Sequence, residues 1–412
     1  MEAFLLLVSV AVIAYALVST KLPKTIISAP MFFVTAGFAI AILRPSIGET
    51  KEQLEILAEL TLVVLLFTDA SRIDARKLMR EVSFPLRLLG VGLPLTVILG
   101  AVLAKILFPE FSLAEAALVA AMLAPTDAAL GQAVVSSPKV PIRIRQALNV
   151  ESGLNDGIIV PVVLFFAALA AIPGPDSESL NWLLFWFQQI TLGPLAGITV
   201  TWICIKALEN AARKNLVSEQ FMDISGIALA VLAWSVANAI GGNGFIAAFA
   251  GGMTVGCTAQ RLRPSIQEFG ETEGQLLSLL AFTLFGTLLP PVLSAATPAM
   301  WLYGLLSLTL IRMLPVTIAM LGTKARLPTL LFLGWFGPRG LASIIFVLLQ
   351  TSENDFVHED GIFQVTIITA LLSVLAHGIS AVPGAAWYGN KVNDDAQNTP
   401  EHKEVHEHET RL

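Results

Sequence analysis

Ionisable residues stand inside long apolar stretches of this sequence, where a charge is costly. Six of them lie well within such stretches: Asp69, Asp127, Glu151, Asp156, Arg312 and Arg339. A charged side chain at the centre of a lipid bilayer costs at least about 2.5–3.5 kcal/mol, so each of these residues is a candidate for function. Such groups are stable in an apolar interior only when they are paired, protonated or bound to an ion.

The densest polar cluster lies in the stretch NVESGLNDGIIVPVV. On a helix, Glu151 and Asn155 are four residues apart, as are Ser152 and Asp156, so we expect these side chains to form one polar patch. Hard oxygen ligands of this kind suit an alkali cation. A carbonyl freed at Thr126 and the carboxylate of Asp69 complete the predicted ligand set, which is Asp156, Asn155, Ser152, Thr126 and Asp69.

Charge balance makes Asp156 the central residue of this hypothesis. Glu151 is expected to form a fixed ion pair with either Arg312 or Arg339, because an unpaired arginine in hydrocarbon is costly. Asp156 then has no permanent partner, and its buried carboxylate is neutralised by a proton or by a cation, but not by both together. Such alternation predicts exchange of the two ions, electroneutral at 1:1 unless Asp69 also titrates.

Long apolar segments must position these residues. The chain has 412 residues, of which 55% are hydrophobic and only 14% charged, whereas about a quarter of a soluble chain is charged. A helix that crosses a bilayer needs about 20 mostly apolar residues. The sequence therefore predicts an all-α polytopic membrane protein with about thirteen transmembrane helices, near 2–19, 25–43, 54–70, 86–107, 113–136, 147–172, 180–205, 222–240, 243–259, 274–293, 299–321, 329–350 and 361–386.

The distribution of basic residues predicts the orientation. Most of the 25 Lys and Arg lie in the odd-numbered loops, and the even-numbered loops carry only Arg44 and Lys51. By the positive-inside rule the N-terminus is outside and the C-terminus is cytoplasmic. The polar segment 387–412 is expected to be a solvated cytoplasmic tail. The alternative is that the tail binds a metal or senses pH through its three histidines, His402, His406 and His408.

Composition excludes several other classes. The net charge of −6 without a basic tract argues against nucleic acid as a partner. The two cysteines, Cys204 and Cys257, lie inside apolar segments and exclude a disulfide framework or a zinc cluster. No cofactor is predicted, and the lipid bilayer is the expected surroundings.

Two apolar segments are interrupted near their middles. The fifth reads LVAAMLAPTDAALGQAVV, with its break at 125–127, and the twelfth reads LLFLGWFGPRGLASIIFVLL, with its break at 337–340. Pairing them implies inverted six-helix repeats at about 1–172 and 222–386, with a linker helix at about 180–205. Matched broken helices in an inverted repeat are typical of a secondary transporter whose site lies near the bilayer midplane.

Each break carries a charge of its own. A broken helix exposes N–H groups at the start of one half and C=O groups at the end of the other. Asp127 suits the positive ends in the fifth segment, and Arg339 suits the negative ends in the twelfth. We expect these two residues to hold the crossing together. His377, in the last segment, is expected to be a satisfied buried histidine rather than a proton carrier.

Three motifs carry a resemblance to a known family. APTDAALGQAVV, ESGLNDGIIVPVV and GWFGPRGLASIIF resemble motifs of the NhaP-type sodium/proton antiporters, in the cation:proton antiporter superfamily, and the similarity covers about 1–386. The resemblance implies exchange of Na⁺ or Li⁺ for H⁺ by an elevator-like motion of a six-helix core. It also implies a homodimer in a plasma membrane, the inner membrane of a prokaryote.

The resemblance assigns roles to individual residues. It places the ion-coordinating aspartate on Asp156, beside Asn155 and Ser152, and the broken-helix pair on Thr126 and Asp127. The acidic residue of the third segment falls on Asp69, where archaeal relatives often have a glutamate, which puts direct coordination by this shorter side chain in question. The family's ion pair falls on Glu151 with Arg339 or Arg312.

Other functions fit the sequence less well. Potassium/proton exchange by the same fold is the alternative within transport. A channel would need a continuous polar lining, which is absent. An intramembrane aspartyl protease would use Asp127 and Asp156, but Asp127 lies in no GxGD-like context and Arg339 has no part in such chemistry. We therefore predict a transporter and not an enzyme.

Overall fold

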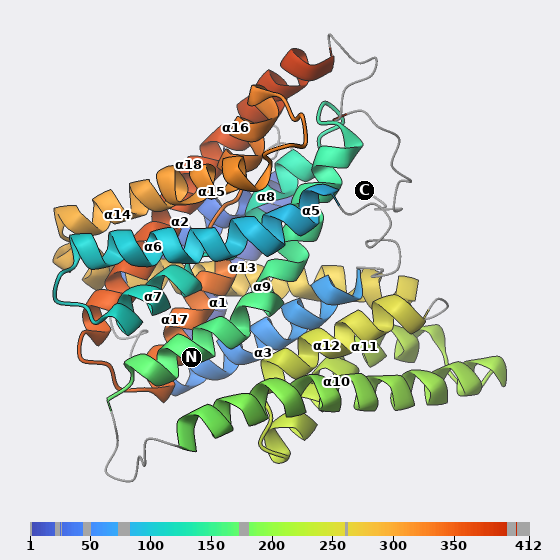
Figure 1. Ribbon diagram of the computed structural model, residues 1–412. Helices are drawn as coiled ribbons and strands as arrows, with labels where there is room; N and C mark the ends of the chain where they lie inside the picture. Colours follow the sequence, from blue (N-terminus) through green and yellow to red (C-terminus); the bar gives the residue numbers. More distant parts are fainter. Residues whose placement is uncertain are drawn as a thin grey trace.

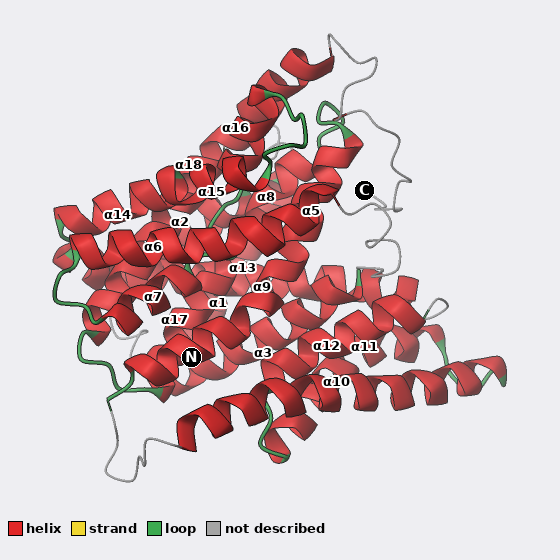
Figure 2. Ribbon diagram, in the orientation of Figure 1, coloured by secondary structure: helices red, strands yellow, loops and turns green. Residues whose placement is uncertain are grey.

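The computed structural model describes residues 2–20, 25, 27–43, 51–72, 83–172, 181–259, 263–393 and 401. Within these residues the chain forms helices joined by short loops and contains no strand (Figure 2). The helices of the first half are α1 (Glu2–Val18), α2 (Ala29–Leu43), α3 (Lys51–Ser71), α5 (Ser83–Arg87), the π-helical turn η3 (Leu88–Gly92), α6 (Leu93–Leu107), α7 (Leu113–Met122), α8 (Ala128–Val135) and α9 (Ile142–Ala170).

The second half is also built of helices. Its helices are α10 (Asn181–Arg213), α11 (Glu219–Ala239), α12 (Gly244–Thr258), α13 (Arg263–Ala295), α14 (Pro298–Leu308), α15 (Leu310–Ala319), α16 (Leu327–Trp335), α17 (Leu341–Glu353) and α18 (Glu359–Asn393). Every predicted apolar segment overlaps one of these helices or a consecutive group of them, and several helices extend beyond the predicted bounds. The fifth and twelfth segments are each divided, into α7 and α8 and into α16 and α17.

Membrane-crossing capacity follows from length and apolarity. Among the described residues, 7 helical stretches are long and apolar enough to cross a membrane. Shorter apolar helices of 10–17 residues, including α2, α7, α12 and α17, supplement them. The all-α, multi-pass architecture is therefore confirmed, whereas the count of thirteen crossings stays a prediction.

The helices pack as two sets that meet along the middle of the molecule (Figure 1). One set contains α10, α11 and α12, at the bottom of the figure, with α1, α2, α3 and α13. The other contains α6, α14 and α16, at the top, with α5, α7, α8, α9, α15, α17 and α18. Each predicted repeat contributes segments to both sets, and both divided segments fall in the second.

Close backbone approach holds the first set together. Gly37 of α2 lies directly against the Thr283 carbonyl of α13, where any Cβ would overlap it. Gly252 of α12 lies in the same way against the Phe67 carbonyl of α3. Small residues of this kind let helices in a membrane approach closely enough for extensive van der Waals contact.

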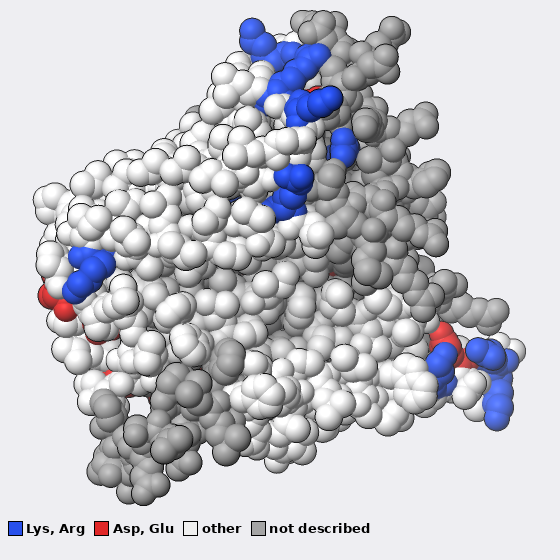
Figure 3. Space-filling model, viewed as in Figure 1, with Lys and Arg blue, Asp and Glu red and all other residues white. Residues whose placement is uncertain are grey.

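Charged side chains gather at the ends of the helices. On the face shown in Figure 3, blue and red atoms lie toward the two ends, and a broad uncharged band separates them. Such a band is what a bilayer requires of a protein surface. The predicted orientation is not tested by this distribution, and several residues used for it lie outside the described residues, namely Lys21, Lys24, Arg44, Arg76, Lys77, Arg80 and Arg261.

The last helix extends past the predicted start of the tail at 387. α18 continues to Asn393 because Tyr388 and Val392 are buried, and the Tyr388 ring stacks on Phe332 with centroids 4.1 Å apart. Farther along, Glu401 is buried and accepts hydrogen bonds from Arg326 N and Thr329 Oγ1. The three tail histidines, His402, His406 and His408, lie outside the described residues.

Candidate ion-binding site at the crossed helices

Local signals explain where the divided helices begin. Ser112 and Glu115 form a capping box at the start of α7, with Ser112 Oγ accepting from Glu115 N at 3.1 Å and Ser112 N donating to Glu115 Oε2 at 2.7 Å. Asp127 is the N-cap of α8, and a proline stands in the first turn of α16. Each of these residues satisfies or removes N–H groups that a helix start leaves free.

The two divided segments meet at their breaks. Asp127 N donates a hydrogen bond to Pro338 O, with the two atoms 2.8 Å apart. The unwound chain of one segment therefore bonds directly to the unwound chain of the other, although they are far apart in sequence. Both breaks are buried, so these backbone groups depend on each other rather than on water.

Asp127 caps two helices at once. Its Oδ1 accepts from Ala129 N at 2.7 Å and Leu130 N at 3.2 Å, at the start of α8. Its Oδ2 accepts from Leu341 N at 2.6 Å, at the start of α17. One carboxylate thus serves the positive ends of two half-helices from different segments. Because both oxygens are engaged by backbone N–H groups, Asp127 is not placed to act in an aspartyl protease dyad.

Arg339 serves the other segment rather than its own. The sequence led us to expect it at the carbonyl end of the first half of its own segment, α16. Instead its Nη1 donates to Ala124 O at 2.7 Å and to Pro125 O at 3.3 Å, just past the end of α7. The expectation was wrong about the partner because the crossing brings the carbonyl end of α7 to the Arg339 guanidinium, which is fully buried.

The glycines around Pro338 make room for charged groups. A Cβ at Gly337 would overlap the guanidinium of Arg312, and a Cβ at Gly340 would overlap the carboxylate of Asp127. Sequence reasoning identified these glycines as part of the break and missed that they provide this space. Their position beside Arg339, an arginine inside an apolar segment, was the sequence signal that a charged group lies close to the backbone here.

Glu151 on α9 pairs with Arg312 on α15. The two side chains form a bidentate ion pair, with Nη1–Oε1 at 2.6 Å and Nη2–Oε2 at 2.8 Å, and both are at most 2% exposed. The structure therefore selects Arg312 from the two arginines that the sequence allowed. The pair also ties α9, from the first predicted repeat, to α15 of the second.

Thr126 is the polar centre of the first break. Its Oγ1 accepts a hydrogen bond from Asn155 Nδ2 at 2.7 Å and lies 2.9 Å from Ser152 Oγ. All three side chains are buried. The polar residues of α9 therefore do not form the single patch that their spacing predicted. Glu151 faces Arg312, while Ser152 and Asn155 face the break, because α9 passes between two neighbours.

Two oxygens beside this network are left without hydrogen-bond donors. In the part of the chain that the structure describes, Asn155 Oδ1 and Asp156 Oδ1 are both buried and have no hydrogen-bond partner. Most buried acceptors in proteins are satisfied, so orphaned oxygens on two consecutive residues need an explanation. A bound cation would satisfy either oxygen, and a proton would satisfy the carboxylate.

Asp69 is the remaining residue of the predicted ligand set. Asp69 lies near the end of α3, and its Oδ1 is 3.7 Å from Arg72 Nη1. An ion pair of this kind competes with coordination of a cation. The residues brought together at the break are thus Thr126, Ser152 and Asn155, with Asp156 next in sequence, and direct coordination by Asp69 stays a prediction.

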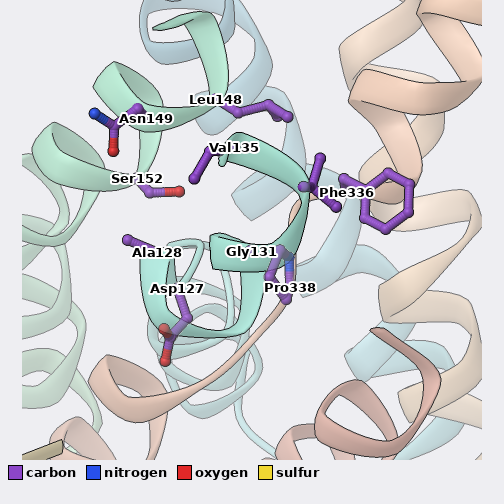
Figure 4. A pocket seen from close by; sticks show the side chains of 10 residues that line it. Asp127, Ala128, Gly131, Val135, Leu148, Asn149, Ser152, Phe336 and Pro338 are labelled. Carbon is purple, nitrogen blue, oxygen red and sulfur yellow. The ribbon is translucent and has the colours of Figure 1, made fainter. Parts of the chain in front are cut away.

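A small pocket reaches the crossing from one side. It is lined by residues of α8, α9 and the two breaks, including Asp127, Leu148, Ser152 and Phe336. Figure 4 shows Ser152 at its edge and the Asp127 carboxylate turned away from it. The pocket therefore offers access to the Ser152 hydroxyl, while Asp127 stays engaged with the helix ends.

Comparison with known proteins identifies the family. The model of the family described as "Sodium/hydrogen exchanger, transmembrane" matches residues 7–387. The chain belongs to this family. The resemblance inferred from the three motifs is thereby confirmed, and the family is one of membrane transporters rather than enzymes, as predicted.

Individual relatives are more distant. The chain is 24% identical over 343 residues to the K(+)/H(+) antiporter NhaP of Alkalimonas amylolytica, covering 81% of this chain and 57% of that protein. It is 25% identical over 319 residues to the Na(+)/H(+) antiporter of Schizosaccharomyces pombe, covering 68% of this chain and 66% of that one. The chain thus spans less than two thirds of the length of either relative.

A solved structure supports the fold. The sodium proton antiporter MjNhaP1 of Methanocaldococcus jannaschii superposes with a TM-score of 0.79 at 17% sequence identity, covering 94% of this chain and 97% of that chain. At this identity the similarity establishes a shared fold. The predicted fold class, all-α with crossed broken helices, is confirmed by this match together with the contacts at the breaks.

Proposed function

We propose that this chain exchanges Na⁺ or Li⁺ for H⁺ across a membrane and that Asp156 binds the two ions alternately. The observation that carries the proposal is the buried Asp156 Oδ1, which has no hydrogen-bond partner in the described structure. Asp127 is held by backbone N–H groups and Glu151 by Arg312. A carboxylate without such a partner is available to a proton or a cation.

The neighbours of Asp156 supply the other oxygens of the proposed site. Asn155 Oδ1 is buried without a donor in the described residues, and the amide nitrogen of the same side chain donates to Thr126 Oγ1. We assign cation ligation to Asp156, Asn155, Ser152 and Thr126, with Asp69 as a further ligand when its contact with Arg72 is released. The cations are substrates, and no resident metal or other cofactor is part of the proposal.

Exchange on a single carboxylate sets the stoichiometry. If only Asp156 loads and unloads, each half-cycle carries one positive charge, so we expect 1:1 electroneutral exchange. Na⁺-driven proton flux in proteoliposomes should then be unchanged by a potassium diffusion potential of either sign in the presence of valinomycin. A flux that follows the potential would contradict one-carboxylate exchange and would point to a second titrating group, such as Asp69.

Potassium/proton exchange is the second candidate. It is favoured by the similarity to the Alkalimonas amylolytica protein, which is a K(+)/H(+) antiporter. Oxygen ligands of the same type serve both cations, so the ligand set alone does not separate them. Flux measured with Na⁺, Li⁺ and K⁺ in turn, each across a range of pH, distinguishes the two candidates.

The arrangement of the helices supports a mechanism of movement. We propose that the set containing both breaks moves as an elevator-like core against the set built on α3, α10, α12 and α13. The active form is proposed to be a homodimer in a prokaryotic inner membrane, with the N-terminus outside. In that orientation the pocket at Ser152 opens toward the cytoplasm, because the N-terminal part of α9 follows a predicted cytoplasmic loop.

Asp156→Asn is the direct test of the site. The amide keeps the size of the side chain but cannot take up a proton, so cation-driven proton flux in proteoliposomes should fall to background. Asp223→Asn on α11 is a matched control, because Asp223 lies away from the breaks and only partly buried. Wild-type flux in the Asp156 variant would overturn the assignment.

A further inference from the structure

A buried serine and histidine on α18 face the second break. Ser373 is fully buried and His377 is 1% exposed, and they are four residues apart, on one side of the helix. Neither belongs to the proposed ion site on α9. From the sequence we singled out His377 but not Ser373, although the spacing of four residues already placed this serine on the same side of a helix as the histidine.

These two residues contact both edges of the break between α16 and α17. Ser373 Oγ accepts a hydrogen bond from Arg339 N, with the atoms 2.6 Å apart. His377 Nε2 donates to Trp335 O at 2.7 Å. Trp335 is the last residue of α16, and Arg339 stands just before α17. Trp335 O and Arg339 N, which would bond to each other in a continuous helix, therefore both bond to α18, and Trp335 O also accepts from Gly337 N at 2.8 Å.

A third contact joins the two residues to each other. Ser373 Oγ lies 3.2 Å from His377 Nδ1. Since Ser373 Oγ already accepts from Arg339 N, its own proton is free to be donated to Nδ1, which also lies 2.9 Å from Ser373 O. The result is a chain of hydrogen bonds from Arg339 N through Ser373 and His377 to Trp335 O, which spans the break.

The side chain of Trp335, at the end of α16, also contacts residues of α18. The Trp335 ring stacks on His377, with centroids 5.2 Å apart and planes at 29°. Its Nε1 donates to Ser380 Oγ at 2.8 Å. Ser380 Oγ itself donates to Ala376 O within α18. Ser380 therefore binds the side chain of Trp335 and its own helix, whereas Ser373 and His377 bind backbone groups of the break itself.

The two breaks differ in what their supporting helix leaves unsatisfied. At the first break, α9 contributes Ser152 and Asn155 to Thr126, and orphaned oxygens remain on Asn155 and Asp156. At the second break, the polar atoms of Ser373 and His377 all have partners. The helix at the first break thus leaves oxygens that can accept an ion, whereas the helix at the second break leaves none on Ser373 and His377. At the second break, Arg339 Nε and Nη2 are buried without partners among the described residues.

We infer that Ser373 and His377 are positioning residues that hold the second break fixed, so that Arg339 and Pro338 in turn hold the first break in its ion-binding geometry. The connection is direct. Ser373 fixes the Arg339 backbone, the Arg339 guanidinium binds Ala124 O, and Pro338 O accepts from Asp127 N, on either side of Thr126. This inference rests on the proposed function, because it concerns the affinity of the same site.

The test measures the apparent KM for Na⁺ and the maximal rate in proteoliposomes that contain equal amounts of protein. Ser373→Ala leaves the buried Arg339 N–H without a partner, and His377→Met removes the donor from α18 to Trp335 O, which keeps only Gly337 N. Loss of one buried hydrogen bond corresponds to about a tenfold change in an equilibrium constant. We therefore expect the KM to rise about tenfold in either variant, with a smaller change in maximal rate.

Conservative variants separate positioning from general stability. His377→Gln keeps an N–H donor near the Nε2 position and should bring the KM back to within about twofold of the unmodified protein. Ser380→Ala, which loses the contact to the Trp335 side chain and the bond to Ala376 O but no bond to the backbone of the break, should also stay within about twofold. If Ser373→Ala does not assemble, Ser373→Cys keeps the size, weakens the hydrogen bond and should give an intermediate KM.

The outcomes are distinct. An unchanged KM in both Ser373→Ala and His377→Met, with only the maximal rate reduced, would overturn the inference. Equal impairment by His377→Gln and His377→Met would do the same. Absence of cation-driven flux in the unmodified protein, or normal flux in Asp156→Asn, would contradict the proposed function instead.

Discussion

At the scale of single residues, the crossing depends on charges whose partners lie on other helices. Glu151 and Arg312 neutralise each other with bidentate geometry, and Asp127 and Arg339 neutralise the ends of half-helices. In a low-dielectric interior, the cost of losing one partner exceeds the benefit of the intact pair, because the other charge stays buried. Each charged residue is thus a point at which a single substitution should have a large effect.

Glu151→Gln should destabilise the protein strongly, because it leaves the Arg312 guanidinium buried without a countercharge. Breaking a buried pair from one side costs about 3–5 kcal/mol. The measurement is the thermal unfolding temperature of the purified protein in detergent.

Three charged residues near the end of α10 provide the control for this prediction, with the Glu209 side chain 11% exposed. Glu209 lies 3.6 Å from Lys206 and 3.8 Å from Arg213, and both basic side chains are at least half exposed. Glu209→Gln should cost less than about 1 kcal/mol. Equal shifts in unfolding temperature for the two variants would show that the Glu151–Arg312 pair has no special importance.

At the scale of the helices, the two breaks fit together only because glycines, which have no side chain, stand where charged groups from other helices lie against the backbone. Gly340 lies directly beneath the Asp127 carboxylate, which at the same time caps α8 and α17. The break in one segment is therefore shaped by a side chain from the other. A residue larger than glycine would have to push that carboxylate away from the helix ends.

Gly340→Ala should reduce both stability and transport, because the added methyl group overlaps the Asp127 carboxylate. Overpacking of this kind typically costs about 1–3 kcal/mol, and here it also displaces two helix caps. Gly90→Ala is the control, since a Cβ at Gly90 in η3 has no neighbouring heavy atom within 4 Å. Unfolding temperature and Na⁺-driven flux are the readouts, and normal values for Gly340→Ala would contradict the proposed role of this glycine.

At the scale of the whole molecule, the end of the chain returns to the helix set that carries the breaks. Glu401 Oε1 accepts from Arg326 N at 3.0 Å and from Thr329 Oγ1 at 2.9 Å, at the start of α16. Thr329 also bonds to Tyr388 on α18. A residue of the predicted tail is thus part of the packing that supports the second divided segment.

The contact made by Glu401 should depend on pH. Burial raises the pKa of Glu401, but the hydrogen bonds from Arg326 N and Thr329 Oγ1 outweigh it and hold the pKa below its ordinary value of 4.5. Because the pKa is lowered in the folded state, the stabilisation is complete above the ordinary value. It is lost as the pH falls through the lowered value.

Glu401→Gln should therefore lower the unfolding temperature at neutral pH, with a cost of about 0.5–2 kcal/mol, as for the loss of a helix cap. The difference between the variant and the unmodified protein should shrink as the pH is lowered past 4.5. Unfolding curves measured at several pH values check this prediction. A difference that persists unchanged in acid would mean that the ionised carboxylate is not the stabilising group.

The sequence by itself determined the class of the protein and the location of its interruptions. Length and spacing of the apolar segments follow from bilayer thickness, which acts on each segment separately. The same is true of Asp127 as a cap of α8, because an N-cap bonds to residues two and three positions farther along the chain. Such features depend on local interactions and can be read from neighbouring residues.

Only the tertiary structure decided which groups meet across the crossing. It pairs Glu151 with Arg312, places Arg339 on the end of α7, gives Asp127 a second helix to cap and connects Ser373 to the Arg339 backbone. Each of these contacts joins residues from different helices. Charge alone allowed Glu151 either arginine, because electrostatic attraction does not specify a partner until packing fixes the distances.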